Sequence, residues 1–382
     1  VEAIINDTSK AGYFGGLAGT GLGHVAFVWS FTTQPTTEDL LTLRDGLYGQ
    51  GPFGYFSEEF PPTLELARLV GPTAGLEEGG TDPAGWETSS ACQPMADNLY
   101  VMRIEDLRPT LDLAIPGLFG TGDGPSTQML LRSLDSIDRI VVGSFRSPYL
   151  LEGGPEDTRP SSSFNLDYEA GTGSISEDRV NFFMFIPKET ETRKQPFDVN
   201  VYGHGYTGGF VGHLFYAGLM ADRGIATVGI NAMGHGIDLG DTSTELLAEL
   251  IFSGACGGPF FDELSRTRAR DLDADGFADP GGDFWSSYLF HTRDGVRQSV
   301  LDQVQLVRLF RSFGTEEGQM LCRTDDTGWA APASLPCDTD GDGSAELPGD
   351  FDGDGVIDVG GPSAMYTTWG ESLGGVLAGI HG

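Results

Sequence analysis

The sequence predicts an α/β fold, in which helices cover a parallel sheet, and the signal lies past residue 175. Apolar strand-like runs alternate there with segments whose apolar residues recur at helical spacing. Strand, helix, strand, helix, strand in this order builds a parallel sheet through right-handed crossovers. A mostly β N-terminal region is expected to precede this sheet.

The elements of the sheet follow from local patterns. IATVGINA is apolar throughout, as expected for a strand buried on both faces. Val296, Val300, Val304 and Val307 recur at helical spacing. The expected strands are 181–187, 197–203, 225–232 and 364–369, and the expected helices are 212–223, 294–313 and the VLAGI segment that begins at Val376.

The region that precedes residue 175 is less regular. The run VAFVWSFT at 25–32 is typical of a half-buried strand. As VAFVWSFTTQ, it resembles the last strand of bacterial immunoglobulin-like domains. The expected organisation is the end of a preceding β domain at 1–36, a mixed and mostly β region at 37–174, and the α/β domain at 175–382 with insertions at 237–293 and 314–362.

Composition narrows the function classes. With 22 Lys and Arg against 56 Asp and Glu, the formal net charge is −34. That charge excludes a nucleic-acid binder, because phosphate recognition needs a basic surface. Hydrophobic residues make up 39% of the chain, which is enough for a packed core. No apolar run is long enough for a membrane span.

Four cysteines weakly indicate an oxidising compartment. None forms the CxxC pair of a zinc or redox site. Cys322 and Cys337 bracket a short stretch that could be a closed loop, which leaves Cys92 and Cys256 as the other candidate pair. The alternative is four unpaired buried thiols, because small buried cysteines are common.

One motif carries chemistry. The strand 364–369 leads into Gly370-Glu371-Ser372-Leu373-Gly374, a GxSxG sequence, and then into a helix. In this strand–turn–helix context the glycines permit a strained turn that presents the Ser372 hydroxyl at the edge of the sheet. The alternative is a glycine-rich turn whose serine caps the helix.

A second loop makes the motif more specific. Strand 197–203 ends in Gly203-His204-Gly205-Tyr206-Thr207-Gly208-Gly209. With both loops in this chain order, residues 175–382 resemble the α/β-hydrolase family, most of all secreted bacterial lipases and esterases. The phrases that carry the resemblance are VNFFMFIPK, VYGHGYTGG, ADRGIATVGINAMGHG, RDGVRQSVLDQVQLVR and WGESLGG.

The resemblance implies a role for each matching residue. Ser372 would be the nucleophile, and the backbone N–H groups of Leu373 and Tyr206 would form the oxyanion hole, with Gly205 as a near alternative. His204 would brace its loop or only fill it. His235 and Asp238 are expected to line the pocket without acting as catalysts.

The sequence departs from the family after Ser372. Only ten residues follow, without an acid and with His381 as the one histidine. His381 lies on the helix that leaves the turn and cannot reach back over the serine. The hydrolase sheet would then be incomplete, so we expect the acid and base from residues beyond this chain, in a continuation or a C-terminal polypeptide that completes the sheet. A degenerate hydrolase without its base is the alternative.

Three DxDxDG segments predict structural Ca²⁺ sites, up to three in number. Carboxylates at positions 1, 3 and 5, a glycine at 6 and a carbonyl at 7 suit calcium. Acids at position 9, with glycine at position 12, resemble thrombospondin-type loops; solvated acidic turns are the alternative. The expected ligands are Asp271, Asp273, Asp275, Phe277, Asp279; Asp338, Asp340, Asp342, Ser344, Glu346; and Asp350, Asp352, Asp354, Val356, Asp358.

The first of these loops lies in the insertion 237–293, which leaves from the carboxyl ends of the strands. Aromatic residues in that insertion form either a lid or acyl-binding wall, or a local core under a long loop. They are Phe252, Phe260, Phe261, Phe284, Trp285, Tyr288 and Phe290.

The leading hypothesis is a secreted, bacterial, calcium-stabilised serine ester hydrolase of the lipase or esterase type. Its substrate would be a small-molecule or lipid ester, and its location extracellular or at the cell surface. The alternative is a calcium-binding surface or adhesion protein that uses a catalytically degenerate hydrolase scaffold.

Overall fold

The structure of the protein is a computed structural model that describes residues 37–67, 101–118, 124–236, 264–323, 335–336 and 347–381. The chain divides into two compact units, 1–39 and 40–382, and nearly all described residues belong to the second. In the described segments no helix has the length and apolarity that a membrane crossing requires. Some of the expected features lie outside the described residues. They are the strand 25–32, the calcium loop 338–346, Asp238, three of the cysteines and the side chain of Cys322.

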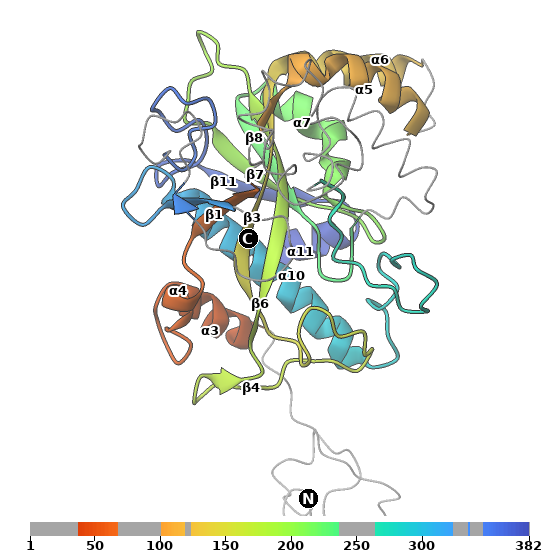
Figure 1. Ribbon diagram of the computed structural model, residues 1–382, viewed down its shortest axis with the longest axis vertical. Helices are drawn as coiled ribbons and strands as arrows, with labels where there is room; N and C mark the ends of the chain where they lie inside the picture. Colours follow the sequence, from red (N-terminus) through yellow and green to blue (C-terminus); the bar gives the residue numbers. More distant parts are fainter. Residues whose placement is uncertain are drawn as a thin grey trace, which may run out of the picture. The chain divides into compact units, whose positions relative to one another are not determined.

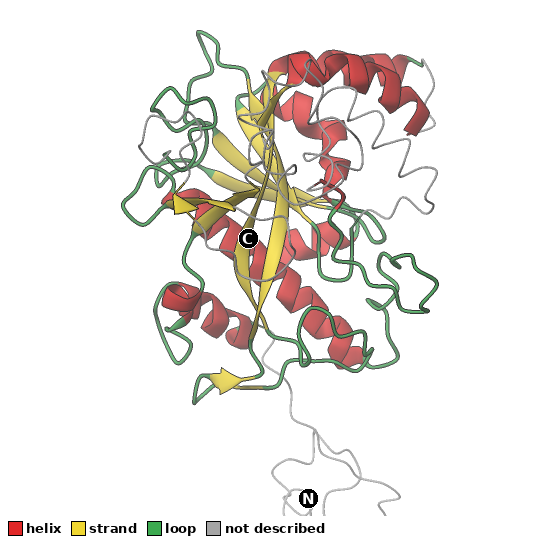
Figure 2. Cartoon of the chain, viewed as in Figure 1, coloured by secondary structure: helices red, strands yellow, loops and turns green. Residues whose placement is uncertain are grey.

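A nine-stranded mixed sheet forms the centre of the second unit, in the order β10-β9-β1-β3-β6-β8-β7-β11, with β2 beside β3. Strand β7 is parallel to β8 and β11, whereas β6 is antiparallel to β8 and β3. The strands gather in one sheet from which long loops project (Figure 2). The bounds are β1 Thr63–Ala67, β2 Val101–Arg103, β3 Ile137–Tyr149, β6 Ser176–Pro187, β7 Asp198–Gly203, β8 Ile225–Ile230, β9 Gln319–Arg323, β10 Leu335–Pro336 and β11 Tyr366–Gly370, beside a small hairpin of β4 Leu166–Asp167 and β5 Thr172–Gly173.

Helices cover both faces of this sheet, which explains its apolar strands. Phe182 and Met184 of β6 join a core that includes α10, whereas Phe183 and Phe185 join a core that includes α5, α6 and α7. Helices α5, α6 and α7 lie together on one side of the sheet (Figure 1). The helices are α3 Glu38–Leu47, α4 Phe56–Glu59, α5 Ile104–Leu118, α6 Pro125–Ser133, α7 Leu214–Ala221, α10 Leu289–Ser312 and α11 Leu373–His381, with 3₁₀ turns at Leu134–Ser136 and Phe210–His213.

The direction in which strands are added reverses at β7. Helix α7 carries the chain from β7 to β8 on one face, and α10 carries it from β8 across to β11 on the other. In open α/β sheets, ligands bind outside the carboxyl ends of the strands at such a reversal. Here those ends lead into His204 after β7 and Glu371 after β11.

The described part of 37–174 differs from the expected, mostly β region. Its long strand β3 belongs to the central sheet and pairs with β6, and four of the described helices, α3, α4, α5 and α6, lie wholly in this range. Helix α5 is hard to predict because it contains Pro109 and Pro116, and proline is unfavourable inside a helix. The antiparallel strands β3 and β6 make the sheet mixed, where the sequence pattern predicts a parallel one. Helix α10 also begins earlier than expected, at Leu289.

Candidate active site at the carboxyl edge of the sheet

Three glycines bring the ends of β7 and β11 into backbone contact. A Cβ atom on Gly374 or on Gly370 would collide with the carbonyl oxygen of Gly203. The Glu371 N–H also donates to the Gly203 carbonyl, at 3.3 Å. Because only glycine fits such a close approach, these positions fix the turn after β11 directly against the end of β7.

Ser372 occupies the strained position of that turn. Its φ is +51°. In this left-handed region a side chain costs roughly 1–2 kcal/mol. The turn is closed by Gly374 N–H to Glu371 O at 2.9 Å and Gly375 N–H to Ser372 O at 3.1 Å. The serine is exposed and leads straight into α11, which is the strand–turn–helix geometry that the GxSxG pattern predicts.

The loop after β7 lies beside the serine. An ideal Cβ on Gly205 would stand 3.7 Å from Ser372 Cβ. Thr207, two residues further on, has φ +61°, a second non-glycine residue in the left-handed region. Strain of this kind persists only where surrounding structure imposes it, and it clusters at functional sites. The two strained residues therefore mark the same edge of the sheet.

His204 holds this loop in place. Its Nε2 accepts the Ala232 N–H at 2.9 Å. The ring proton is therefore on Nδ1, which donates to Gly205 O at 2.8 Å. Burial lowers the pKa of His204 to about 4, because a charged imidazole would be desolvated. With both nitrogens engaged, this histidine braces the loop and has no nitrogen free for proton transfer.

Within the described structure, the backbone N–H groups of Tyr206 and Leu373 are free to serve as oxyanion donors. The Gly205 carbonyl accepts from His204 and from the Gly208 N–H, and the N–H of Tyr206 points the opposite way across the same planar peptide. Leu373 opens α11, and the first N–H groups of a helix have no partner within it. Among the described residues neither Tyr206 nor Leu373 donates a backbone hydrogen bond outside regular helices and strands.

His235 is buried, and its ring packs against the ring of Tyr206. Its ring contacts those of His204, Tyr206 and Phe284, with centroids 5.2–5.7 Å apart. Its Nδ1 lies 2.9 Å from the Met233 carbonyl and donates to it, whereas Nε2 has no hydrogen-bond partner in the described part of the chain. Burial lowers its pKa, because a charged imidazole would be desolvated. His235 therefore supports the loop from below.

The remaining described histidines lie elsewhere. His213 is buried against Phe183 and Phe185, and burial lowers its pKa to about 3. His291 Nδ1 donates to Ser162 O, and His381 ends α11. Within the described residues, no histidine forms a hydrogen bond with the Ser372 hydroxyl.

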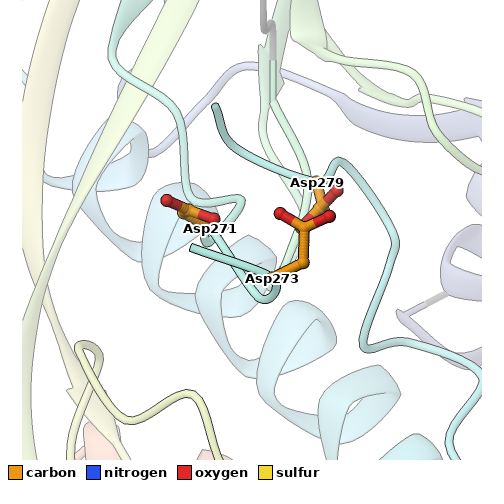
Figure 3. Close-up of side chains that lie close together, drawn as sticks. All are labelled: Asp271, Asp273 and Asp279. Carbon is orange, nitrogen blue, oxygen red and sulfur yellow. The ribbon is translucent and has the colours of Figure 1, made fainter. Parts of the chain in front are cut away.

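Two of the three acidic loops are described, and the first begins at Asp271. Carboxylate oxygens of Asp271, Asp273 and Asp279 lie within 4.8 Å of one another (Figure 3). Asp271 accepts the N–H groups of Ala274 at 2.7 Å and Gly276 at 3.0 Å, which folds the loop around its first carboxylate. The loop is largely exposed and follows directly on the segment 264–270 at the carboxyl edge. Asp275 is outside the cluster of three.

The second loop has the same backbone pattern in a different setting. Asp350 accepts the N–H groups of Gly353 and Gly355, both at 2.7 Å, at the positions equivalent to 274 and 276. Asp350, Asp352 and Asp358 form the cluster here, without Asp354. Asp358 is fully buried, and burial together with Asp352 and Asp350 raises its pKa to about 7. This loop stands at the opposite edge, since Phe197 N–H, just before β7, donates to Asp358 O.

A buried ion network near the site was not predicted from the sequence. Arg268 Nη2 lies 2.6 Å from Asp178 Oδ2 and 2.9 Å from Asp302 Oδ2, and Nη1 donates to Asn231 O. Burial raises the pKa of Asp178 to about 6, although Arg268 opposes the shift. The signal was the RTRAR segment, a local basic cluster in a strongly acidic chain.

Comparisons with known proteins do not assign this chain to a family. No protein-family model matches the chain, and no curated protein matches it. Among solved structures, a PEG-bound complex of a novel cold-adapted esterase from an Arctic intertidal metagenomic library is similar at 13% identity. That match covers 61% of this chain and 86% of the other, with a TM-score of 0.14, which does not establish a shared fold.

Proposed function

We propose that the protein is a serine ester hydrolase whose nucleophile is Ser372. The observation that carries the proposal is the left-handed Ser372, held by glycine contacts at the carboxyl end of β11 and beside the loop that follows β7. In α/β-hydrolases the nucleophilic serine lies on a strained, exposed strand–turn–helix turn of this kind. Neither the fold alone nor the solved esterase would support this assignment.

The proposed chemistry is acyl transfer. The base takes the hydroxyl proton of Ser372 as Oγ attacks the ester carbonyl carbon; the bond to the alcohol oxygen then breaks, and the base gives that proton to the leaving alcohol. In the second step the base takes a proton from water, the water attacks the acyl carbon, and the proton passes to Ser372 Oγ as the acid product leaves. The N–H groups of Leu373 and Tyr206, with Gly205 as the near alternative, would stabilise the oxyanion, each by roughly 3 kcal/mol. The base and acid are assigned to residues outside the described part of the chain.

The acidic loops are proposed to be structural calcium sites. Carboxylates held within 4.8 Å of one another suit a hard cation with oxygen ligands. At Asp350–Asp358 a buried carboxylate is crowded by two others, and a bound cation would relieve that repulsion. Calcium loops without the bidentate glutamate suit millimolar extracellular calcium, so we propose a secreted or surface location.

The proposal is tested on the natural full-length protein with p-nitrophenyl butyrate as substrate. Ser372→Ala should lower kcat/KM by about 10⁴-fold or more, since the nucleophile cannot be replaced. A fluorophosphonate should add one covalent label to the natural protein and none to the variant. Ser161→Ala, a change at an exposed serine in a turn, is the matched control and should keep full activity and labelling.

Full activity in Ser372→Ala would overturn the assignment. If the natural protein neither hydrolyses esters nor accepts the label, a surface or adhesion protein on a degenerate scaffold becomes the better explanation.

A further inference from the structure

Two exposed aromatic side chains form a shelf next to the candidate site. Tyr206 is 40% exposed and Trp285 is 65% exposed, and their ring centroids are 6.1 Å apart. We call these two residues the aromatic shelf. Tyr and Trp are enriched at binding interfaces, because their rings offer a large apolar face beside a polar group.

The shelf is supported from below, so it is a built surface. Phe284 is buried and packs edge-on against Trp285 at 5.1 Å, and it also contacts Tyr206 at 6.2 Å. The Tyr206 hydroxyl donates to Gly281 O at 3.0 Å, which fixes the phenol end. His235 fills the space behind the Tyr206 ring. The two exposed rings are therefore held in place on a buried base.

The aromatic shelf is continuous with the candidate nucleophile. Tyr206 directly follows Gly205, where an added Cβ would stand 3.7 Å from Ser372 Cβ. On the other side, Phe284 lies in the same buried cluster as Leu373, the residue after the serine. A group bonded to the carbonyl that Ser372 attacks would therefore lie next to the shelf.

The charges around the shelf favour a neutral ligand. Glu371 adjoins Ser372, and the acidic loop that begins at Asp271 leads into the segment that carries Trp285. Among the described residues, two nearby cations are already paired, Arg268 with Asp178 and Asp302, and Arg270 with Asp283. A ligand with its own negative charge would be repelled by these carboxylates, and neither Arg268 nor Arg270 is free to offset that repulsion.

We infer that the aromatic shelf binds an aromatic ring of a neutral ester substrate, a specificity that rests on the proposed hydrolase function. A ring lying against Trp285 would gain contact area and ring–ring attraction that an aliphatic ester lacks. The ring belongs either to the acyl group or to the alcohol, and the two sources are separable by substrate choice.

The test measures kcat/KM of the full-length protein and of Trp285→Ala for methyl benzoate, phenyl acetate and methyl acetate. Trp285→Ala should lower the value about tenfold for the ester whose ring uses the shelf. Methyl acetate should change by less than about twofold, as should every ester in the matched control Leu289→Ala, whose side chain is 77% exposed. A loss confined to methyl benzoate places the ring on the acyl group, and a loss confined to phenyl acetate places it on the alcohol.

The preference for a neutral ligand has its own test. Dimethyl terephthalate should be hydrolysed faster than its monomethyl ester, which carries a carboxylate.

An equal loss for all three esters, or no loss for either aromatic one, would overturn the inference while leaving the hydrolase intact. If the natural protein hydrolyses none of them, the proposed function fails and the shelf is tested by binding alone. Calorimetry with methyl benzoate should then show binding to Ser372→Ala that weakens about tenfold in Ser372→Ala/Trp285→Ala. Equal affinities, or no binding, would refute the shelf as a ring site.

Discussion

The two edges of the same three parallel strands are built in opposite ways. At the carboxyl edge Ser372 and Thr207 hold strained left-handed conformations. At the amino edge the Asp350–Asp358 loop has its buried carboxylates bonded to its own backbone. The amino edge is also joined to the strands, through Phe197 and Asp358.

The difference shows which edge of this fold can hold strained backbone conformations. Unfavourable backbone conformations persist only when the surroundings over-determine them. Gly203 and Gly374 provide that constraint at the carboxyl edge by direct backbone contact, and His204 adds a hydrogen bond across to the residue that follows β8 by two positions. We therefore expect changes at the carboxyl edge to alter activity together with local structure, and changes at the amino edge to alter stability alone.

The largest effect is expected from Gly374→Ala. Its Cβ would collide with the Gly203 carbonyl, which is backbone and cannot rotate away. We expect a loss of about 4 kcal/mol or more in the free energy of unfolding, at the upper end for overpacking, and loss of esterase activity. Urea denaturation and p-nitrophenyl butyrate hydrolysis measure the two effects.

Gly379→Ala is the control on the same helix. No atom lies within 4 Å of an added Cβ there. Alanine also favours a helix by up to about 1 kcal/mol. This variant should be as stable as the natural protein or more so. Equal stability of the two alanine variants would show that the close contact of β7 and β11 is not needed.

The features that the sequence predicted well have short-range causes. The GxSxG turn depends on residues within a few positions of each other, and it adopts the expected strand–turn–helix backbone. The two described DxDxDG loops share one local hydrogen-bond pattern, whereas calcium binding by them stays a prediction. The expected sheet strands 181–187, 197–203, 225–232 and 364–369 correspond to β6, β7, β8 and β11, with shifts at their ends. Apolar runs of that length report burial reliably.

The features that it did not predict depend on long-range pairing. The position of β3 beside β6 follows from contacts between distant segments of the chain, which no local pattern encodes. The Arg268 network joins residues from β6, α10 and the segment 264–270 for the same reason. Exposure also separates Phe284, which is buried, from Trp285, although the sequence pattern places both in one aromatic group.

Acid should weaken the carboxyl edge through His204. The folded ring has a pKa of about 4 against 6.5 when unfolded, so below pH 6.5 the unfolded chain binds a proton that the folded chain refuses. The free energy of unfolding should fall by about 3 kcal/mol as pH drops from 6.5 to about 4. His235 and Arg268 face this ring and oppose its protonation in the same direction.

Urea denaturation of the natural protein and of His204→Gln across this pH range isolates the contribution. Asp178 changes the free energy of unfolding in the opposite direction. Because its pKa is raised in the folded protein, its contribution to stability falls as pH rises from 3.8 to about 6. The difference between the two proteins removes that shared effect. Parallel pH curves for the two proteins would contradict the role of His204.

The smallest of the three effects is expected from the calcium loops, which separate the two edges most directly. If both loops bind calcium, free calcium at about 100 times Kd adds ~2.7 kcal/mol of stability for each site. Asp350→Asn should remove that gain without lowering the activity of the folded protein, because its loop packs at the amino edge. Asp271→Asn should remove its own gain and also lower kcat/KM, because its loop leads into Gly281, which holds the Tyr206 hydroxyl. Thermal unfolding in calcium and in EGTA, with esterase assays, measures both, and a melting temperature indifferent to EGTA in the natural protein would refute calcium binding at either edge.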